Sequence, residues 1–399
     1  MNFLYRCFFP TAGFLVAGLL FGCSGATSTI PVVTVTPPTS TATVPAPAPT
    51  PTVPAPPTVK AKFGYTGNQG ASLSGYTVDP SSGELTALSG FPILVGQNPT
   101  VITHDPQNRF LIVGDISSSQ LHVFAINGTT GALAEVSPSP YVTVKEPVAV
   151  ITDPAGTHVY VASQGGNQVG AYSLSSTGVL TSIAGGPFST GSTATTGLTV
   201  GAAGIVTDAG GKFLYVQDLA NIYTFSIDSS SGALTLLQTV PGANFGGAIA
   251  LDPAGSYLYG VGSGTNSILT YSINATTGFL AQVKSSAMLE KNGAYTISIS
   301  PTGQFAYTIE NNNDLVSYVI SNGGFTPVGK VYSGVYGEQI AVDPSGSFVY
   351  VPQACSFCAS GLYNVVNEFS IGSTGALTPL PSPTVAAGVT PWGITLTTQ

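Results

Sequence analysis

Three charged residues, Glu146, Glu338 and Lys291, lie near the starts of β-rich stretches and could together carry out hydrolytic chemistry. Hydrolysis of an ester needs a base that activates water and a cation or hydrogen-bond donor that stabilises the developing oxyanion. Glu146 or Glu338 could supply the base, and Lys291 the positive charge. The sequence contains no G-x-S-x-G, H-E-x-x-H or G-x-x-x-x-G-K-[ST] motif, so these three residues are the catalytic candidates.

A wider set of polar residues could bind a ligand instead. Amides and carboxylates together with one aromatic ring suit a sugar, another small polar molecule or a peptide. Each of these residues could equally be a solvated loop residue, and the single tryptophan, Trp392, could pack within the fold rather than stack on a ligand. The predicted ligand-binding residues are Asp115, Glu146, Asp218, Asn292, Glu338 and Trp392.

Two cysteines, Cys355 and Cys358, are separated by two residues within one long loop. In an oxidising compartment they are expected to form a local disulfide, although a redox pair or half of a zinc site would use the same spacing. A zinc site would need a second ligand pair, which the sequence lacks, and no D-x-D-x-D-G calcium loop is present. We therefore predict a disulfide, no metal and no cofactor.

A repeat must position these residues. A sequence motif close to D-P-x-G-x-F-L-Y-V occurs six times, and its copies are 43 to 55 residues apart. This period is typical of four-stranded propeller blades. The D-P-x-G step predicts a hairpin turn, because Asp accepts bonds from its own backbone, Pro presets φ and Gly tolerates a positive φ. A later T-T-G or S-S-G step closes a second hairpin. The six copies begin at Asp105, Asp153, Asp208, Asp252, Ser300 and Asp343.

The two ends of the repeat region complete a ring. Residues 63–88 supply the second, third and fourth strands of a blade, and residues 391–397 have the pattern of a first strand with nothing after it. Pairing of Ile394 to Thr397 with Phe63 to Thr66 would close this blade and remove exposed sheet edges that invite aggregation. The predicted fold is all-β: a seven-bladed β-propeller of four-stranded antiparallel blades, closed by pairing of the C-terminal strand with the N-terminal blade.

The first 59 residues are expected to target and tether the protein. Residues 1–22 combine Arg6, a short apolar stretch and a small-residue site before Cys23, a pattern that resembles a bacterial lipoprotein signal peptide. An ordinary signal peptide or membrane anchor with a chance cysteine is the alternative. In the lipoprotein interpretation, residues 23–59 are a Pro/Thr-rich linker lipidated at Cys23, and residues 60–399 are the propeller. Ser24 after the lipidated cysteine points to the outer membrane.

Charge and composition narrow the range of partners. The chain has 399 residues, 7% of them charged, and a formal net charge of −8. A net negative charge disfavours a polyanionic partner, so no nucleic acid is expected. The 49 glycines and 30 prolines fit an all-β protein with many turns. The expected partners are a small polar molecule, a sugar or an envelope protein, and we expect a monomer in an extracytoplasmic, lipid-anchored location.

The repeat region resembles the lactonase-like seven-bladed β-propellers, which include 6-phosphogluconolactonase-type enzymes and a muconate-lactonising enzyme. The resemblance covers roughly residues 60–399 and rests on the paired turns and on the stretches Phe110–Val113, Phe213–Leu219 and Phe348–Val351. It implies histidine, arginine and glutamate at the central mouth of the ring. It also implies a Pro-His step leading into the first strand of a middle blade and a D-L-G loop after its second strand.

The sequence departs from that pattern at the implied site. The loop has the sequence D-L-A from Asp218, and the step into the blade has the sequence G-A-A-G from Gly201, without histidine. Strand order places Arg109, His104 and His158 in or beside turns opposite the mouth. The main functional prediction is therefore a cell-envelope binding or scaffolding module for a small polar ligand or protein partner. The alternative is a lactonase acting on a sugar lactone or a related cyclic ester.

Overall fold

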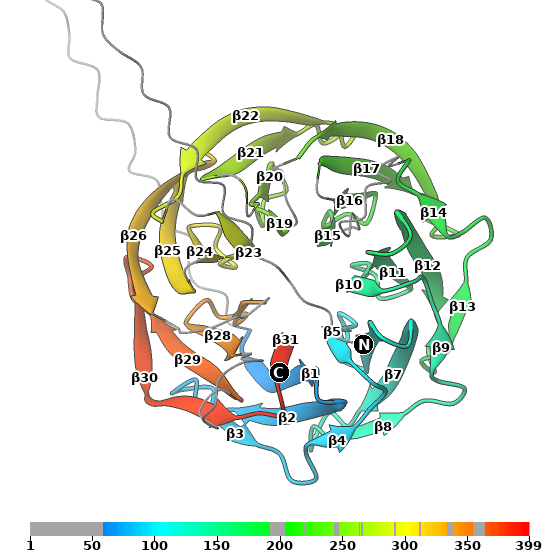
Figure 1. Ribbon diagram of the computed structural model, residues 1–399, viewed down its shortest axis with the longest axis horizontal. Helices are drawn as coiled ribbons and strands as arrows, with labels where there is room; N and C mark the ends of the chain where they lie inside the picture. Colours follow the sequence, from blue (N-terminus) through cyan, green and yellow to red (C-terminus); the bar gives the residue numbers. More distant parts are fainter. Residues whose placement is uncertain are drawn as a thin grey trace, which may run out of the picture. The chain divides into compact units, whose positions relative to one another are not determined.

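A computed structural model describes residues 59–191, 204–218, 220–242, 247–262, 264, 266–290, 293–310, 313–332, 339–353 and 364–398. Within these ranges the strands form seven antiparallel sheets, which stand as blades around a common axis (Figure 1). No helix in the described ranges is long and apolar enough to cross a membrane. The predicted all-β, seven-bladed propeller is confirmed.

Each blade runs from an innermost strand at the axis to an outer strand at the rim (Figure 1). The innermost strands are β31 (Pro391–Thr398), β5 (Pro99–His104), β10 (Pro147–Thr152), β15 (Gly204–Thr207), β19 (Ile249–Leu251), β23 (Ala294–Ile299) and β27 (Ala341–Val342). The second strands are β1 (Ala61–Asn68), β6 (Phe110–Asp115), β11 (His158–Ser163), β16 (Phe213–Gln217), β20 (Tyr257–Gly260), β24 (Phe305–Glu310) and β28 (Phe348–Gln353). In this order the blades are numbered 1 to 7.

The third strands of blades 1 to 7 are β2 (Ser72–Val78), β7 (Gln120–Ile126), β12 (Gln168–Leu174), β17 (Asn221–Ile227), β21 (Ser267–Ile273), β25 (Asp314–Ser321) and β29 (Val365–Ile371). Blades 4 to 7 have continuous outer strands: β18 (Leu234–Pro241), β22 (Leu280–Ala287), β26 (Gly324–Tyr332) and β30 (Leu377–Ala386). In blades 1 to 3 the outer strand is in two pieces: β3 (Leu85–Ala87) with β4 (Ile93–Leu94), β8 (Leu133–Glu135) with β9 (Tyr141–Val142), and β13 (Leu180–Ser182) with β14 (Phe188–Ser189). The breaks contain prolines, which have no N–H to donate to a neighbouring strand.

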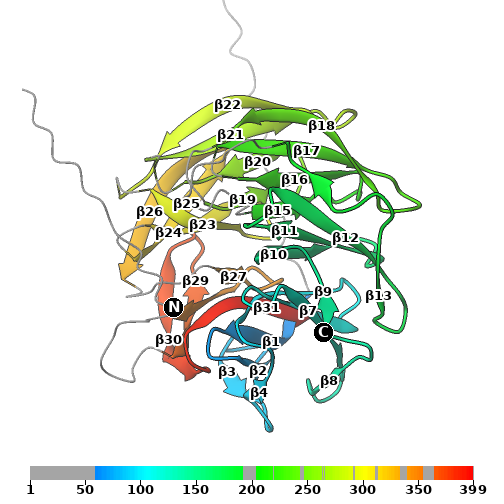
Figure 2. The ribbon, with the colours of Figure 1, turned by 45° about the vertical axis from the view of Figure 1, so that its right-hand side comes forward.

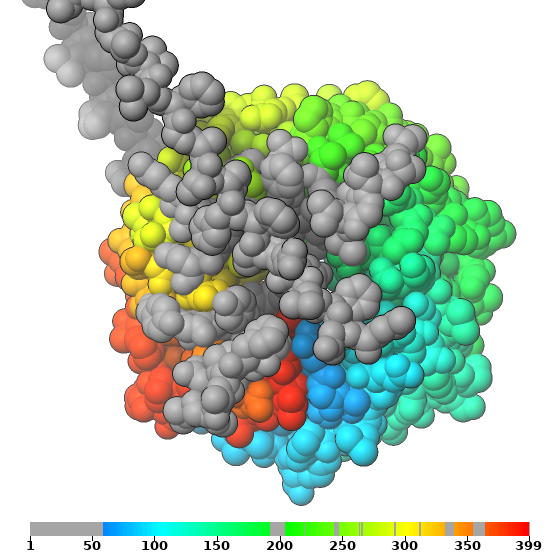
Figure 3. Space-filling view, viewed as in Figure 1, coloured from blue at the N-terminus to red at the C-terminus, as the bar shows by residue number. Residues whose placement is uncertain are grey.

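The C-terminal strand closes the ring as predicted. β31 pairs antiparallel with β1, with Thr66 opposite Ile394 and Phe63 opposite Thr397. Figure 2 shows β31 and β1 side by side, and Figure 3 shows red and blue atoms, the two ends of the colour scale, in contact with each other. Blade 1 is therefore built from both ends of the described chain, which holds the ring shut.

The repeated aspartates cap the turns between the first and second strands. Asp105 Oδ1 accepts bonds from the N–H groups of Arg109 and Phe110, at 2.6 and 2.7 Å. Asp208 and Asp343 make the same pair of bonds in their blades. In blade 6, Ser300 replaces the aspartate and its Oγ accepts one bond, from Phe305 N at 3.0 Å. The predicted turn chemistry is confirmed, because one short side chain satisfies two backbone donors.

A second recurring contact joins neighbouring blades. In each blade a glycine with positive φ, in the turn before the outer strand, lies against the aromatic ring that begins the second strand of the preceding blade. A Cβ on Gly232, for example, would lie 2.3 Å from Cδ2 of His158, which occupies the aromatic position of blade 3. The seven pairs are Gly83 with Phe348, Gly131 with Phe63, Gly178 with Phe110, Gly232 with His158, Gly278 with Phe213, Gly323 with Tyr257, and Gly375 with Phe305.

Replacing one of these glycines with alanine is expected to destabilise the fold by more than the strain of an alanine at positive φ, because the new Cβ also clashes with the aromatic ring. Gly278 has φ +71°, and an added Cβ would lie 2.5 Å from Phe213 Cδ1. Gly255 has φ +69° but no atom within 4 Å of such a Cβ, so it provides a matched control. We expect Gly278→Ala to lower the free energy of unfolding by about 3 kcal/mol and Gly255→Ala by about 1 kcal/mol. Equal losses in urea unfolding would contradict the proposed blade contact.

A buried carboxyl group lies between blade 7 and blade 1. Glu368, in β29, is 1% exposed, and its Oε2 accepts the N–H of Leu85 at 2.7 Å. Its Oε1 has no hydrogen-bond partner among the described residues. Burial raises the pKa of Glu368 to about 7, and the nearby Glu84 carboxylate adds to the rise, while the Leu85 bond opposes it. The folded protein therefore binds this proton more tightly than the unfolded chain does.

This pKa predicts a stability that falls as pH rises. Below about pH 4.5 the group is protonated in both states, and between there and about pH 7 only the folded state keeps the proton. The stability that this proton contributes is therefore lost as the pH rises from about 4.5 to about 7, and it stays lost above pH 7. We expect Glu368→Gln to remove this pH dependence and to add about 2 kcal/mol of stability near pH 8. Urea unfolding of both proteins near pH 5 and pH 8 measures the difference, and parallel pH profiles would contradict the assignment.

Candidate functional site at the mouth of the ring

The mouth lies where loops lead into the innermost strands and where the second strands turn into the third. Among the sequence-predicted residues the structure places Glu146, Asp115, Asp218 and Trp392 at this end of the blades. Three further predicted residues, Lys291, Asn292 and Glu338, lie outside the described residues. So do Cys23 and the cysteines Cys355 and Cys358.

Glu146 offers an accessible carboxylate at the mouth. It immediately precedes β10 and has φ +51°, a left-handed conformation that costs a non-glycine residue about 1 kcal/mol. Two bonds hold this backbone: Glu146 N donates to Ser119 Oγ at 3.2 Å, and Gln164 N donates to Glu146 O at 2.9 Å. The side chain itself is 38% exposed. The rigid backbone and open carboxylate suit a base that meets a ligand from solvent.

Lys145 places a cation beside this carboxylate. Its Nζ lies 3.5 Å from Glu146 Oε1, and its side chain is 67% exposed. An exposed pair of this kind adds little to stability, so both groups remain available to a ligand. Sequence reasoning missed Lys145, although its position next to Glu146 in the K-E-P step was a visible signal.

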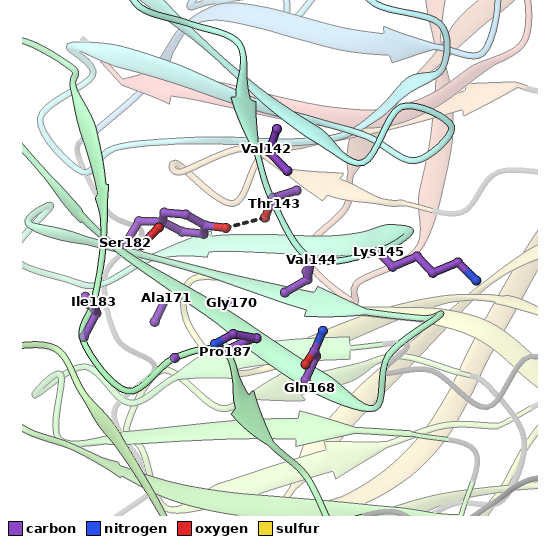
Figure 4. A pocket seen from close by; sticks show the side chains of 12 residues that line it. Val142, Thr143, Val144, Lys145, Gln168, Gly170, Ala171, Ser182, Ile183 and Pro187 are labelled. Carbon is purple, nitrogen blue, oxygen red and sulfur yellow. Dashed lines mark hydrogen bonds between the residues drawn. The ribbon is translucent and has the colours of Figure 1, made fainter.

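A groove of about 230 Å³ extends from Lys145 along blade 3 (Figure 4). The loop before β10 forms one wall, through Thr143 and Val144, and β12 and the turn at Pro187 form another. Tyr172 also lines the groove, and its hydroxyl donates to Thr143 Oγ1 at 2.8 Å. Gln168 and Lys145 are the polar groups with long side chains in the lining. The groove could hold part of a polar ligand whose reacting end lies at the mouth.

Asp115 and Asp218 are at the predicted end of their blades, but their carboxylates face the backbone. Asp115 is fully buried, and its Oδ1 accepts the N–H groups of Ser117 and Ser118 at 3.0 Å each. Burial pushes the pKa of Asp115 upward, yet the backbone bonds, that of Gln97 first, outweigh it and leave the pKa below its usual value. Both carboxylates fasten mouth loops, and their predicted part in ligand binding stays a prediction.

Asp218 shows the same use of a carboxylate in blade 4. Its Oδ1 accepts the N–H groups of Ala220 and Asn221, at 2.8 and 2.7 Å, and its Oδ2 accepts the hydroxyl of Tyr223 at 2.7 Å. The Asp218 carboxylate therefore bonds to its own blade at Ala220, Asn221 and Tyr223.

Blade 6 carries a network of acids around one lysine. Glu310 is fully buried; its Oε1 accepts the Tyr318 hydroxyl, and its Oε2 accepts the N–H of Glu290 at 2.7 Å. Burial raises the pKa of Glu310, against the lowering effect of the Tyr318 bond. Lys330 Nζ lies 2.6 Å from both Glu290 Oε1 and Asp314 Oδ2. These bonds hold Glu290, which follows β22, against β24 and β26.

The remaining residues of interest are partly buried or bonded to neighbouring side chains within the fold. Trp392 is half-buried near the start of β31, at the closing blade. His122 is 5% exposed, and its Nδ1 lies 2.8 Å from Glu135 Oε1. Arg109 and His158 belong to turns at the end opposite the mouth, as strand order predicted, and each lies within 3.0 Å of its turn aspartate.

Comparisons with known proteins agree with this architecture. Residues 57–152 and 150–294 match the family described as lactonase, seven-bladed β-propeller. A candidate 6-phosphogluconolactonase from Bacteroides uniformis superposes with a TM-score of 0.73 at 17% identity, covering 85% of this chain and 99% of that one. The periplasmic gluconolactonase of Pseudomonas aeruginosa superposes with a TM-score of 0.69 at 16% identity, with 85% and 99% covered.

At these identities the structural similarities show the fold alone. No curated protein matches the sequence. The family match, by contrast, spans more than half of the chain and covers the segments that form blades 2 to 5 and all of blade 1 except β31. The chain belongs to the lactonase family of seven-bladed β-propellers.

Proposed function

We propose that this propeller hydrolyses a sugar lactone or a related cyclic ester at its mouth, with Glu146 as the general base. Membership of the lactonase family carries the proposal. The relative from Pseudomonas aeruginosa is a gluconolactonase, and the Bacteroides uniformis protein is a candidate 6-phosphogluconolactonase. The exposed pair of Glu146 and Lys145 supplies the base and the cation that such a reaction needs.

The chemistry can be written with these two side chains. The Glu146 carboxylate takes a proton from water as the water oxygen attacks the lactone carbonyl carbon. The Lys145 ammonium stabilises the negative charge that develops on the carbonyl oxygen. The ring C–O bond then breaks, and the leaving alkoxide takes the proton back from Glu146. The product is the open-chain hydroxy acid, and the enzyme returns to its starting state.

A binding or scaffolding module for a small polar ligand or an envelope protein is the second candidate. The observation that favours it is the bonding of Asp115, Asp218 and Glu310, whose buried carboxylates fasten loops rather than face the mouth. If these three carboxylates take no part in catalysis, Glu146 and Lys145 are left to carry it out.

Nuclear magnetic resonance of a lactone mixed with the purified protein separates the two candidates. Hydrolysis converts the lactone signals into those of the hydroxy acid faster than in buffer. Line broadening without conversion would reject the hydrolase and support the binding module. The lactones offered should include gluconolactone and simple unsubstituted rings.

For location, we infer an extracytoplasmic lipoprotein of the outer membrane, cleaved after residue 22 and lipidated at Cys23. The signal-like residues 1–22 and the Pro/Thr-rich residues 23–59 support this inference. A disulfide between Cys355 and Cys358 suits the same compartment. Metabolic labelling with palmitate tests the inference: label in the wild type and its loss in Cys23→Ala are expected, and an unlabelled wild type would refute it.

A further inference from the structure

A second cavity, open to solvent and of about 250 Å³, lies among the innermost strands at the end of the blades opposite the mouth. It is lined from β5, β23, β27 and β31 and from the turn at Pro344, so blades 1, 2, 6 and 7 all contribute. Three of these strands, β5, β23 and β31, lie beside the axis in Figure 1. Because β31 is one wall, the cavity depends on closure of the ring.

Three polar side chains line this cavity. His104 Nδ1 lies 2.7 Å from Thr395 Oγ1, and the Ser298 side chain belongs to the same lining. His104 O accepts the hydroxyl of Thr152 at 3.0 Å, which fixes the end of β5. Burial lowers the pKa of His104, so its imidazole is neutral near pH 7. The cavity therefore combines hydrogen-bonding groups that carry no charge.

The rest of the lining is apolar. The aliphatic residues of the lining come from β31, β27 and the residue before β27: Ile340, Val342, Ile394 and Leu396. None of the cavity-lining residues is an Asp, Glu, Lys or Arg. An uncharged ligand fits such a lining, since a charged group would lose hydration there without gaining a partner. For size, an apolar cavity of about 150 Å³ in another protein holds benzene.

We propose that this cavity is a binding site for a small uncharged cyclic molecule that bears a carbonyl group. When the Thr395 hydroxyl donates to Nδ1, the imidazole proton is on Nε2, and that N–H is free to donate to the ligand's carbonyl oxygen. The aliphatic side chains contact the ring of the ligand. The site is separate from Glu146 and does not depend on hydrolysis at the mouth.

The test uses δ-valerolactam, a stable six-membered cyclic amide, with the purified full chain. Isothermal titration is expected to show saturable binding in the millimolar range. Thr395→Val keeps the side-chain shape but removes the bond to His104, and should weaken binding about fivefold or more. His104→Phe should weaken it at least as much. Thr235→Val, the same substitution at an exposed position of β18 in blade 4, is the control and should bind valerolactam as the wild type does.

Three results would overturn the proposal: no binding to the wild type, equal binding to Thr395→Val, or loss of binding in Thr235→Val. If a variant fails to fold, a crystal structure of the wild type with valerolactam decides, because the ligand must then lie beside His104. Lactone hydrolysis in Glu146→Gln is measured separately. Failure of the mouth as an active site is thereby distinguished from failure of this cavity as a binding site.

Discussion

Removal of residues 391–399 is expected to prevent stable folding. These residues include all of β31, the innermost strand of blade 1, which pairs with β1 along its length. The side chains of Ile394 and Leu396 are buried, and loss of each removes about 1.5 to 3 kcal/mol of burial energy. The deletion also exposes the inner edge of β1. Together these losses approach the whole stability of a typical domain, about 5 to 15 kcal/mol.

Soluble yield and thermal melting followed by circular dichroism measure this effect. The truncated protein should aggregate or melt without a cooperative transition, whereas removal of Gln399 alone should leave the melt unchanged. A truncated protein that melts cooperatively at the wild-type temperature would show that β31 does not hold the ring shut.

Glu146→Gln is expected to lower the rate of lactone hydrolysis by at least about a hundredfold, the size of effect typical when a general base is lost. The amide keeps the shape of the side chain but cannot take a proton from water. Glu146→Gly is expected to abolish the same activity while raising stability by about 1 kcal/mol, because glycine adopts φ +51° without strain. Initial rates and urea unfolding of the three proteins measure both effects.

The Glu146→Gly variant tests whether a loss of activity comes from misfolding. A loss of activity together with a gain of stability cannot come from misfolding. If Glu146→Gln and Glu146→Gly retain the wild-type rate, Glu146 is not the base, and the base must be sought elsewhere at the mouth.

The fold was predictable because its signals are local and repeated. Asp105 and Asp208 cap their own turns within five residues, so their chemistry is visible in the sequence. The closing pair of β31 with β1 followed from an incomplete blade at each end. The contact of Gly232 with His158 could not be predicted, because it joins a turn of one blade to a strand of another.

The site was only partly predictable. Strand order placed Asp115 and Asp218 at the correct end of their blades, but it carries no information on whether a carboxylate turns to solvent or to the backbone. Lys145 was passed over because it belongs to no repeated motif, although it stands next to Glu146 in the sequence. His104 was predicted opposite the mouth and lies there, yet the cavity beside it arises from four blades and has no sequence signal.

The most direct test of lactone hydrolysis is the rate of acid release from gluconolactone, measured by pH-stat with spontaneous hydrolysis subtracted. The account predicts a rate that rises in proportion to protein concentration and saturates with substrate. A rate equal to that of buffer, for gluconolactone and for every other lactone offered, would contradict it.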